Sequence, residues 1–292
     1  MPITGLNKMK RELINNDICG KKKIPNNKYN GKTFVIKYGG AAMTEKKLRD
    51  LFAEDIIYLK KKGIRAVIVH GGGNDISSMS KKLNVPVKFV NGLRYTSKDT
   101  MEIAKMVLIG KTNKEIISTI NKAGGNAVGF SGIDANVFIA RKLRKAGEDL
   151  GYVGEILKVN TSFIELLLSN GYTPVIAPIG TDDKGRIYNI NADDAAATTA
   201  VFLKADKLIY VTDVSGVLAE GKTIKRIDMK TAFDLIEKNV INKGMVPKIL
   251  SAFKSINSGV KKVHIINGTK HHSLLKDIFT DKSRGTEIVV VK

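Results

Sequence analysis

The chain has 292 residues, enough to bury one large core or two lobes that share a sheet. It contains no run of about eighteen apolar residues, which excludes a membrane-spanning helix, and its single cysteine, Cys19, excludes an internal disulfide and fits a reducing compartment. The net charge of +21 comes from forty lysines and nine arginines, spread along every segment. Nucleic-acid recognition favours arginine and stacked aromatic side chains, and the chain lacks tryptophan. We therefore interpret the charge as a solvated lysine surface and expect neither a nucleic-acid nor a membrane partner.

The first thirty residues form a lysine- and asparagine-rich extension. No apolar stretch follows its charges, which argues against a secretory signal, and Glu12, Asp17 and the lack of serine argue against an organellar transit peptide. Leu6, Met9 and Leu13 fall close to helical spacing. Two interpretations stay open: a solvated tail, or a short helix that packs on another subunit and supports oligomerisation.

A strand followed by a glycine turn organises the rest of the chain. Residues 33–37 predict a buried strand, and Gly39-Gly40 follows before a helix expected over 44–62. Such a turn exposes backbone N–H groups to an anion near a helix N-terminus, and Lys37 adds a positive charge there. The next strand, 64–69, ends in the triple glycine 71–73. A right-handed βαβ crossover makes the two strands parallel, so both glycine turns are expected at one edge of the sheet.

The alternation of strands and helices continues to the C-terminus and predicts an α/β fold. Ser97 is expected to cap a long helix that reaches about Ala123. Residues 137–142 and 152–159 are expected to form a hairpin that projects from the sheet. The other expected strands cover 127–130, 173–177, 207–211, 262–266 and 287–291, and the other expected helices cover 75–83, 162–168, a stretch ending near 203, 232–238, 247–257 and 272–280.

Familiar phosphate and metal motifs are absent from the sequence. Gly110-Lys111-Thr112 and Gly31-Lys32-Thr33 resemble the end of a Walker loop, but the required upstream glycines are missing. The triple glycine lacks the third Rossmann glycine because Ile76 stands there. No histidine has a partner at metal-ligand spacing, so no metal site is predicted, and His271 and His272 are interpreted as exposed residues at a helix start.

Four residues combine a polar side chain with an unusual position. Lys37 closes a buried strand, where its charge needs an anion or a carboxylate nearby. Arg94 lies in an Asn-Gly-Leu-Arg turn, either as a surface residue or as a carboxylate clamp. Asp193 either caps the helix that follows it or has a functional role. Lys248 follows Pro247 at a helix start, where it opposes the helix dipole, and this favours a functional role.

The chain resembles a known family through seven motifs in order: KYGGAAM, HGGGNDI, NGLRYT, GYVGEI, YNINADDAA, VTDVSGVL and GMVPKI. From about Gly31 onward it is similar to the N-acetyl-L-glutamate kinases, a branch of the amino acid kinase family. The resemblance implies a three-layer αβα sandwich with an open, mainly parallel central sheet and two lobes. Residues 31–204 would bind the amino-acid substrate and dimerise, and residues 205–292 would bind ATP. The implied reaction is phosphorylation of the side-chain carboxylate of N-acetyl-L-glutamate by ATP, with Mg²⁺ carried by the nucleotide, the second step of arginine biosynthesis.

The resemblance also implies roles for individual residues. Lys37 and Lys248 would flank the transferring phosphoryl group, and Asp193 would hold both lysines in place. Gly40 and Gly72 would donate backbone hydrogen bonds to the phosphoryl oxygens. The amino-acid substrate would contact Gly72, Gly73, Arg94, Asn189 and Asn191, with Arg94 on the α-carboxylate, and the nucleotide would contact Asp213, Val214, Gly216, Val217, Leu218, Gly244 and Met245.

The chemistry of the reaction agrees with these residues. A glutamate-type carboxylate has a pKa of about 4.3, so at neutral pH it is already an anionic nucleophile that needs no general base. This suits a chain without a convincing catalytic histidine. The difficulty is to bring an anion to a polyanion, and lysines with preorganised N–H groups address it by positioning and charge stabilisation.

Assembly and control are expected from the same resemblance. One branch of the family is inhibited by arginine and assembles as a hexamer, a trimer of dimers, through an N-terminal helix. Ile278-Phe279-Thr280 and Arg284-Gly285-Thr286 look similar to that branch, whereas residues 1–30 and Ser283-Arg284 depart from it. We expect a homodimer, with a hexamer and arginine inhibition as hypotheses. The expected location is the cytoplasm, or the plastid stroma if the gene is organellar.

Two competing interpretations stay open. A relative with the same fold could phosphorylate a longer or carrier-linked amino acid, such as an aminoadipate derivative, although the Arg94 turn argues against it. A non-catalytic arginine- or nucleic-acid-binding module is the other alternative. The presence of Lys37, Asp193 and Lys248 argues against a chain that has lost catalytic activity. A steep salt dependence of oligonucleotide binding would support the nucleic-acid-binding module.

Overall fold

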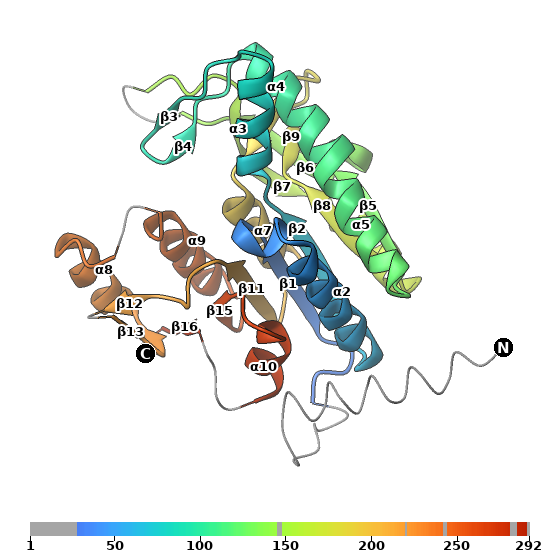
Figure 1. Ribbon diagram of the computed structural model, residues 1–292, viewed down its shortest axis with the longest axis vertical. Coiled ribbons are helices and arrows are strands. Elements are labelled where there is room, and N and C mark those ends of the chain that lie inside the picture. The colour runs from blue at the N-terminus through green and yellow to red at the C-terminus, as the bar shows by residue number, and fades with distance from the viewer. Residues whose placement is uncertain (1–27, 145–147, 220, 242–243, 281–284, 291–292) are drawn as a thin grey trace.

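The computed structural model describes residues 28–144, 148–219, 221–241, 244–280 and 285–290, and an eight-stranded sheet lies at its centre (Figure 1). The strand order is β14-β16-β15-β11-β1-β2-β8-β5. The six strands from β15 to β5 run parallel, and β16 is antiparallel to β15. The bounds are β14 (Arg226–Ile227), β16 (Thr286–Ile288), β15 (Val263–Asn267), β11 (Lys207–Thr212), β1 (Thr33–Tyr38), β2 (Arg65–His70), β8 (Thr173–Ala177) and β5 (Ala127–Ser131). This is the predicted α/β fold with a mainly parallel sheet.

Strand β1 lies inside the sheet and begins the predicted βαβ unit. Helix α2 (Lys46–Lys61) connects it to β2, and the two strands pair in parallel with Lys37 opposite Val69. The two glycine turns therefore lie at one edge of the sheet, as predicted. The α-helix begins at Lys46 rather than at residue 44, because a 3₁₀ turn, η1 (Gly40–Met43), comes first.

Helices cover both faces of the sheet and complete the three layers. Since successive residues of a strand face opposite sides, β1 contributes Phe34, Ile36 and Tyr38 to one core and Val35 to the other. The first core packs against α2, α5 (Asn113–Lys122) and α10 (Ser273–Phe279). The second packs against α6 (Thr161–Ser169), α7 (Ala192–Phe202) and α9 (Val246–Asn257), and α8 (Met229–Glu237) contacts α9.

A smaller group of strands stands apart from the main sheet. β6 (Phe138–Lys142) and β7 (Val153–Val159) form the predicted antiparallel hairpin. They close into a four-stranded barrel with β9 (Ile179–Thr181) and β10 (Ile187–Ile190). The sequence around Pro178 indicates a turn and does not predict β9. Because β10 leads directly into α7, the barrel fixes the point at which α7 begins.

The helix predicted from Ser97 to Ala123 is continuous but not α-helical throughout. Ser97 caps its start, as predicted, by accepting a hydrogen bond from the Thr100 N–H at 3.1 Å. Helix α4 (Lys98–Lys105) passes into a π-helical segment, η2 (Met106–Thr112), before α5 begins. The Walker-like sequence Gly110-Lys111-Thr112 lies inside this segment and forms no phosphate loop.

Short elements complete the fold. Helix α3 (Gly73–Lys82) follows the second glycine turn, and β3 (Phe89–Val90) pairs with β4 (Leu93–Arg94). The 3₁₀ turn η3 (Asp134–Asn136) precedes β6, and β12 (Leu218–Ala219) pairs with β13 (Lys222–Thr223). The sequence does not predict the two-residue strands, because they are too short to show a periodic pattern.

His272 contradicts the prediction that it is an exposed residue at a helix start. It has a left-handed conformation with φ 48° just before α10, and its side chain is buried. Its Nδ1 contacts the carboxylate of Asp55 on α2. The prediction was wrong because this end of α10 packs against α2 rather than facing solvent. His271 is exposed, as predicted.

Some predictions concern residues outside the described ranges. One is the choice between a solvated tail and a short helix for the N-terminal extension, up to residue 27. The other is the difference at Ser283-Arg284 from the branch that is inhibited by arginine. Within the described ranges, no helix is both long enough and apolar enough to span a membrane.

Candidate active site

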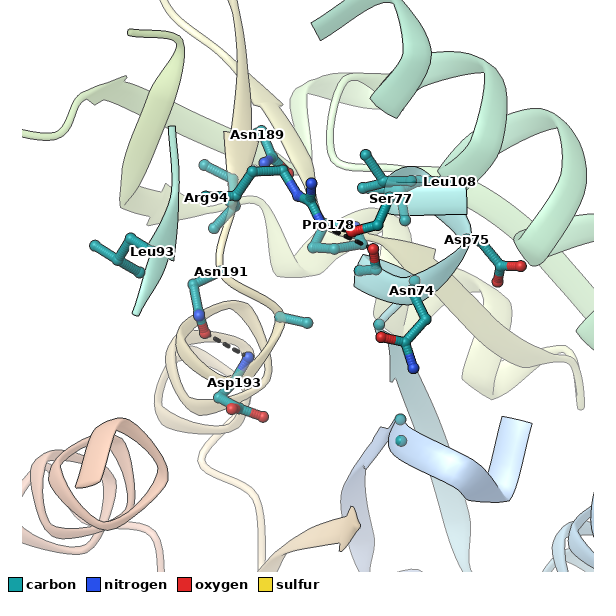
Figure 2. A pocket seen from close by; sticks show the side chains of 18 of the residues that line it. Asn74, Asp75, Ser77, Leu93, Arg94, Leu108, Pro178, Asn189, Asn191 and Asp193 are labelled. Carbon is teal, nitrogen blue, oxygen red and sulfur yellow. Dashed lines mark hydrogen bonds between the residues drawn. The ribbon is translucent and has the colours of Figure 1, made fainter. Parts of the chain in front are cut away.

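One cavity of about 340 Å³ opens at the carboxyl edge of the sheet (Figure 2). It is enclosed by the two glycine turns, the start of α7 and the β3–β4 hairpin. Ligands of open parallel sheets bind at this edge, outside the carboxyl ends of the strands. Of the nine residues predicted for catalysis and amino-acid binding, eight line the cavity: Lys37, Gly40, Gly72, Gly73, Arg94, Asn189, Asn191 and Asp193. The ninth, Lys248, contacts Asp193.

Asp193 joins the two predicted lysines. Nζ of Lys37 lies 3.1 Å from its Oδ1, and Nζ of Lys248 lies 3.0 Å from its Oδ2. Lys37 and Asp193 are buried. Burial by itself would raise the pKa of Asp193, but the charges of Lys37 and Lys248 outweigh it and hold the pKa below its usual range. Two ammonium groups and one carboxylate leave a net charge of +1 in a buried place, which suits an anionic ligand.

Asn191, not Asp193, caps helix α7. Its Oδ1 accepts hydrogen bonds from the N–H groups of Asp193 at 2.9 Å and Asp194 at 3.2 Å. The side chain of Asp193 is therefore left to meet the lysines, and the interpretation of this residue as the helix cap is wrong. Asn189 lines the same cavity, and its Nδ2 donates to Oγ1 of Thr96 at 3.2 Å.

One glycine in each turn has little room for a side chain. A Cβ on Gly39 would lie 2.4 Å from Nζ of Lys37, and a Cβ on Gly72 would lie 2.5 Å from Cδ2 of Leu108. Gly40 has a φ of +69°, in the left-handed region that favours glycine. Bare backbone at these positions lets N–H groups approach a ligand closely.

Arg94 is buried rather than exposed in a surface turn. Its Nη2 donates to the carbonyl of Gly73 and to Oγ of Ser77, both at 2.7 Å, and the ring centre of Phe89 lies 4.8 Å from its Cζ. Nη1 is buried and donates no hydrogen bond to the part of the chain that the structure describes. A buried N–H without an acceptor is costly, so the geometry favours a ligand carboxylate at Nη1. Figure 2 shows Arg94 reaching toward Ser77, while Asp193 lies apart from them at the start of α7.

Sequence reasoning gives no role to Ser77, Phe89 or Leu108, although all three line the cavity. Ser77 lies four residues after Gly73 and therefore on the same face of α3, which is a signal that could have found it. Phe89 and Leu108 come from separate segments, and the sequence alone does not indicate which segments meet.

A second cavity, of about 40 Å³, gathers five of the seven predicted nucleotide-binding residues. Val214, Gly216, Val217, Leu218 and Met245 line it, together with Val240 and Ile241. Asp213 instead lies against Gly40, where a Cβ would be 3.4 Å from the Asp213 nitrogen. Gly244 is exposed just before Met245 and does not line this cavity. An apolar slot of this kind suits the flat face of an aromatic ring.

The threonine at the start of β16 supports the loop at this second cavity. Oγ1 of Thr286 accepts a hydrogen bond from the Val217 N–H at 2.8 Å and donates to the carbonyl of Ile224 at 2.7 Å. Thr286 is fully buried. A residue distant in sequence therefore fixes the backbone of the predicted nucleotide loop.

Comparison with known proteins assigns a family. The sequence profile of the amino acid kinase family matches residues 32–267. The chain belongs to the amino acid kinase family. Its main sheet and the cavity at the carboxyl edge both fall largely within the matched residues.

Relatives of this amino acid kinase match it over most of its length. The acetylglutamate kinase of Chlorobaculum tepidum is 52% identical over 262 residues, 90% of this chain and 92% of that protein. The acetylglutamate kinase of a Hydrogenobaculum species is 52% identical over 263 residues, 88% of this chain and 92% of that protein. Among solved structures, the N-acetylglutamate synthase of Neisseria gonorrhoeae, complexed with coenzyme A and N-acetyl-glutamate, has a TM-score of 0.82 at 27% identity. That match covers 90% of this chain and 61% of the synthase chain.

Proposed function

We propose that the chain transfers the γ-phosphoryl group of ATP to the side-chain carboxylate of N-acetyl-L-glutamate, the second step of arginine biosynthesis. Two relatives that are 52% identical to it carry the name acetylglutamate kinase. The products would be N-acetyl-L-glutamyl 5-phosphate and ADP. The cavity supports this proposal because it presents positive charge at two separate places, one for each carboxylate of the substrate.

The free Nη1 of Arg94 is the observation that carries the proposal. It offers a buried, charged donor with no acceptor among the described residues, whereas Lys37 and Lys248 gather at Asp193. The α-carboxylate of the substrate would bind Nη1 and direct the side-chain carboxylate toward the lysines. The guanidinium keeps its charge at any working pH, so this contact does not depend on proton uptake.

The acidic side chains of the cavity favour an acetylated substrate. Among its lining residues, the carboxylates are Asp193 and Asp75, and each is already paired with lysine. Nζ of Lys111 lies 2.7 Å from Oδ1 of Asp75. The charged amino group of free glutamate would therefore find no free carboxylate, whereas an acetamido nitrogen is neutral and needs none.

Catalysis would rest on position and charge rather than on a general base. The side-chain carboxylate attacks as an anion, and Lys37 and Lys248 reduce its repulsion from the phosphate. The N–H groups of Gly40 and Gly72 would contact oxygens of the transferring group. Asp193 would hold both lysines and remain ionised, because their charges keep its pKa low.

ATP would bring its own magnesium ion. Asp193 is engaged by two ammonium groups, and within the described ranges no group of three or more His, Cys, Asp or Glu side chains could hold a metal ion. Mg²⁺ bound to the phosphates would spread their charge during transfer. The base would lie against Val214, Val217, Leu218 and Met245, with the phosphates toward Gly40 and Lys248.

The ion pair between Asp193 and Lys248 would also join two lobes. If residues 31–204 bind the amino acid and residues 205–292 bind ATP, Asp193 belongs to the first lobe and Lys248 to the second. Their contact at 3.0 Å would hold the lobes in the arrangement needed for transfer.

A panel of acceptors tests the proposed reaction. ADP release is measured with Mg·ATP and N-acetyl-L-glutamate, L-glutamate, L-aspartate or N-acetyl-L-aminoadipate. We expect turnover with N-acetyl-L-glutamate and little with free glutamate, because the free amine is not accommodated. Activity on N-acetyl-L-aminoadipate alone would assign the chain to the relatives that phosphorylate a longer amino acid. No activity on any acceptor would favour the non-catalytic binding module.

We also propose a homodimer that works in the cytoplasm. Strand β5 ends the strand order of the main sheet, and Leu166 of α6 and Tyr172, just before the neighbouring strand β8, are 57% and 43% exposed. The single cysteine suits a reducing compartment. A hexamer and inhibition by arginine stay predictions. Sedimentation that gives only a dimer would exclude the hexamer, and unchanged activity in millimolar arginine would exclude inhibition by arginine. Sedimentation as a monomer would contradict the proposed dimer.

A further inference from the structure

His70 is a buried histidine beside the cavity that the proposed reaction does not use. It ends β2, is fully buried and precedes the triple glycine. Both ring nitrogens have partners: Nδ1 lies 2.7 Å from the carbonyl oxygen of Gly71, and Nε2 lies 3.2 Å from Nδ2 of Asn113. Asn113, the first residue of α5, is also fully buried. The ring is therefore held in one orientation.

The amide of Asn113 determines which ring nitrogen carries the proton. Its Nδ2 also lies 3.0 Å from the carbonyl oxygen of Val175, which can only accept, so the atom at this place is the amide nitrogen. Because an amide nitrogen only donates, Nε2 of His70 must accept and the proton must be on Nδ1. Nδ1–H then donates to the carbonyl of Gly71. Burial lowers the pKa of His70 to about 4, which keeps the ring neutral near pH 7.

The hydrogen bond to Gly71 controls the direction of the next N–H group. The carbonyl of Gly71 and the N–H of Gly72 belong to one planar trans peptide unit and point in opposite directions. With the carbonyl turned toward His70, the Gly72 N–H is directed away from the ring. Gly72 lines the cavity, and its N–H donates no hydrogen bond to any described residue.

The π-helical segment η2 supports the same turn from its other side. Leu108 of η2 contacts Gly72 so closely that a Cβ there would lie 2.5 Å from Cδ2 of Leu108. Leu108 and Asn113 are five residues apart, and a π-helix aligns residues at this spacing because its hydrogen bonds join residues five apart. A plain α-helix would turn them to different faces. The π-helical winding therefore brings Leu108 to Gly72 and Asn113 to His70 together.

We propose that His70 is a positioning residue for phosphoryl transfer. Its Nδ1–H holds the Gly71–Gly72 peptide so that the Gly72 N–H faces an oxygen of the transferred phosphoryl group, and Asn113 selects the required tautomer. This inference rests on the proposed kinase reaction. The hydrogen bond from His70 would orient the Gly72 N–H before the substrate arrives. No reorganisation of this donor would then accompany the chemical step.

Two substitutions separate the roles of the two ring nitrogens. His70→Asn keeps a side-chain N–H near the position of Nδ1, whereas His70→Gln keeps an acceptor near Nε2 and loses the δ donor. Both are assayed with the acceptor that the wild type phosphorylates. We expect His70→Gln to lower kcat about tenfold or more with KM values within about twofold, and His70→Asn to stay within about threefold of the wild type. His271→Gln, at an exposed histidine, is the control and leaves kcat unchanged.

Equal losses of kcat in both His70 variants, or no loss in either, would overturn the positioning role. Thermal unfolding of each variant, compared with the wild type, identifies a loss of activity that comes from unfolding. If a variant unfolds, the positioning role is tested instead by the protonation state of the His70 ring in the wild-type protein.

The protonation state of the ring has a readout that does not need turnover. The chain has four histidines, so ¹H–¹⁵N spectra of protein labelled with ¹⁵N-histidine resolve each ring, and His70→Asn assigns the His70 signal. We expect the Nδ1–H form at pH 7 and its loss in Asn113→Leu. An Nε2–H ring would overturn the inference even in an active kinase. A wild type that phosphorylates no carboxylate would instead contradict the proposed function, whatever the tautomer.

Discussion

At the scale of single residues, the carboxylate of Asp193 reduces the repulsion between two lysine side chains. Lys37 and Lys248 would repel each other if both were placed beside the same phosphoryl group, and the carboxylate between them removes most of that cost. Each lysine keeps N–H donors that Asp193 does not use, since an ammonium group has three. The cluster therefore stays positive and can still bind an anion.

Removing either lysine should lower turnover more than substrate affinity. For Lys37→Ala and Lys248→Ala we expect kcat to fall about a hundredfold or more, because the charge is needed most where the transferring group is most negative. KM values should change by no more than about threefold. Steady-state kinetics with both substrates measures this. Lys254→Ala, on the exposed side of α9, is the control with unchanged kcat, and a loss confined to KM would contradict the assigned roles.

The buried His70 should also make folding stability depend on pH. Burial lowers its pKa to about 4, whereas an unfolded histidine has a pKa of about 6.5. Between these values the unfolded state binds a proton that the folded state does not, so the free energy of unfolding falls as pH drops below 6.5 and levels off below 4. The charge of Asp75, which is itself paired with Lys111, acts on the ring in the opposite direction and only partly offsets burial.

His70→Asn removes this titration and isolates its contribution. Between pH 8 and pH 5, urea unfolding of the wild type should lose about 2 kcal/mol more than unfolding of the variant. Other groups, including Asp55 with its pKa raised by burial to about 6, titrate in both proteins and cancel in the comparison. Parallel stability curves for the two proteins would contradict a buried, neutral His70.

At the scale of elements, α7 and α9 are joined by two neighbouring contacts. Asp193 meets Lys248, and the next residue, Asp194, accepts a hydrogen bond from Oγ of Ser251, three residues further along α9. Ser251 is buried. The second contact fixes the rotation of α9 about its axis and therefore the direction in which Lys248 points.

Removing this second contact should disturb catalysis indirectly. We expect Ser251→Ala to lower kcat about threefold to tenfold, since small misplacements of a catalytic group are costly. Ser251→Thr keeps the hydroxyl and should retain most of the activity. The kcat of both variants, measured with saturating substrates, tests whether the contact between Ser251 and Asp194 helps to place Lys248. An unchanged kcat in Ser251→Ala would show that Asp193 alone places Lys248.

The sequence predicts the elements whose residues carry a local signal. Lys37 was identifiable because a charged residue seldom closes a buried strand, and the glycine turns because they follow β1 and β2 directly. The order of strands and helices follows from hydrophobic periodicity, apart from the shortest strands. The meeting of Lys37, Asp193 and Lys248 at one point was expected from family resemblance, not from periodicity.

Other features depend on contacts between distant segments and leave no local pattern. The π-helical winding of η2 has the hydrophobic pattern of an ordinary helix, so the sequence predicts one α-helix there. His272 was misplaced because its burial depends on α2, more than two hundred residues earlier. Ser251 and Asp194 look like ordinary polar helix residues until α7 and α9 are brought together.

At the scale of the whole molecule, one continuous sheet connects the two proposed lobes. β1 of the first lobe pairs with β11 of the second along five residues, Phe34 to Tyr38 opposite Lys207 to Val211. The smaller cavity, proposed for the nucleotide, is lined by residues that follow β11, and the larger cavity lies at the ends of β1 and β2. Phosphoryl transfer would therefore take place at the joint between the lobes, where β1 and β11 lie side by side (Figure 1). Lys37 is the last residue but one of β1, and Asp213 follows β11 directly.

Trapping the product of the reaction identifies which carboxylate of N-acetyl-L-glutamate is phosphorylated. The chain is incubated with Mg·ATP, N-acetyl-L-glutamate and hydroxylamine, which converts an acyl phosphate into a stable hydroxamate, and mass spectrometry locates the modified carboxylate. We expect a hydroxamate on the side-chain carboxylate that depends on ATP and disappears in Lys37→Ala. A hydroxamate on the α-carboxylate, or none while ATP is hydrolysed, would contradict the orientation set by Arg94 and the roles of the two lysines.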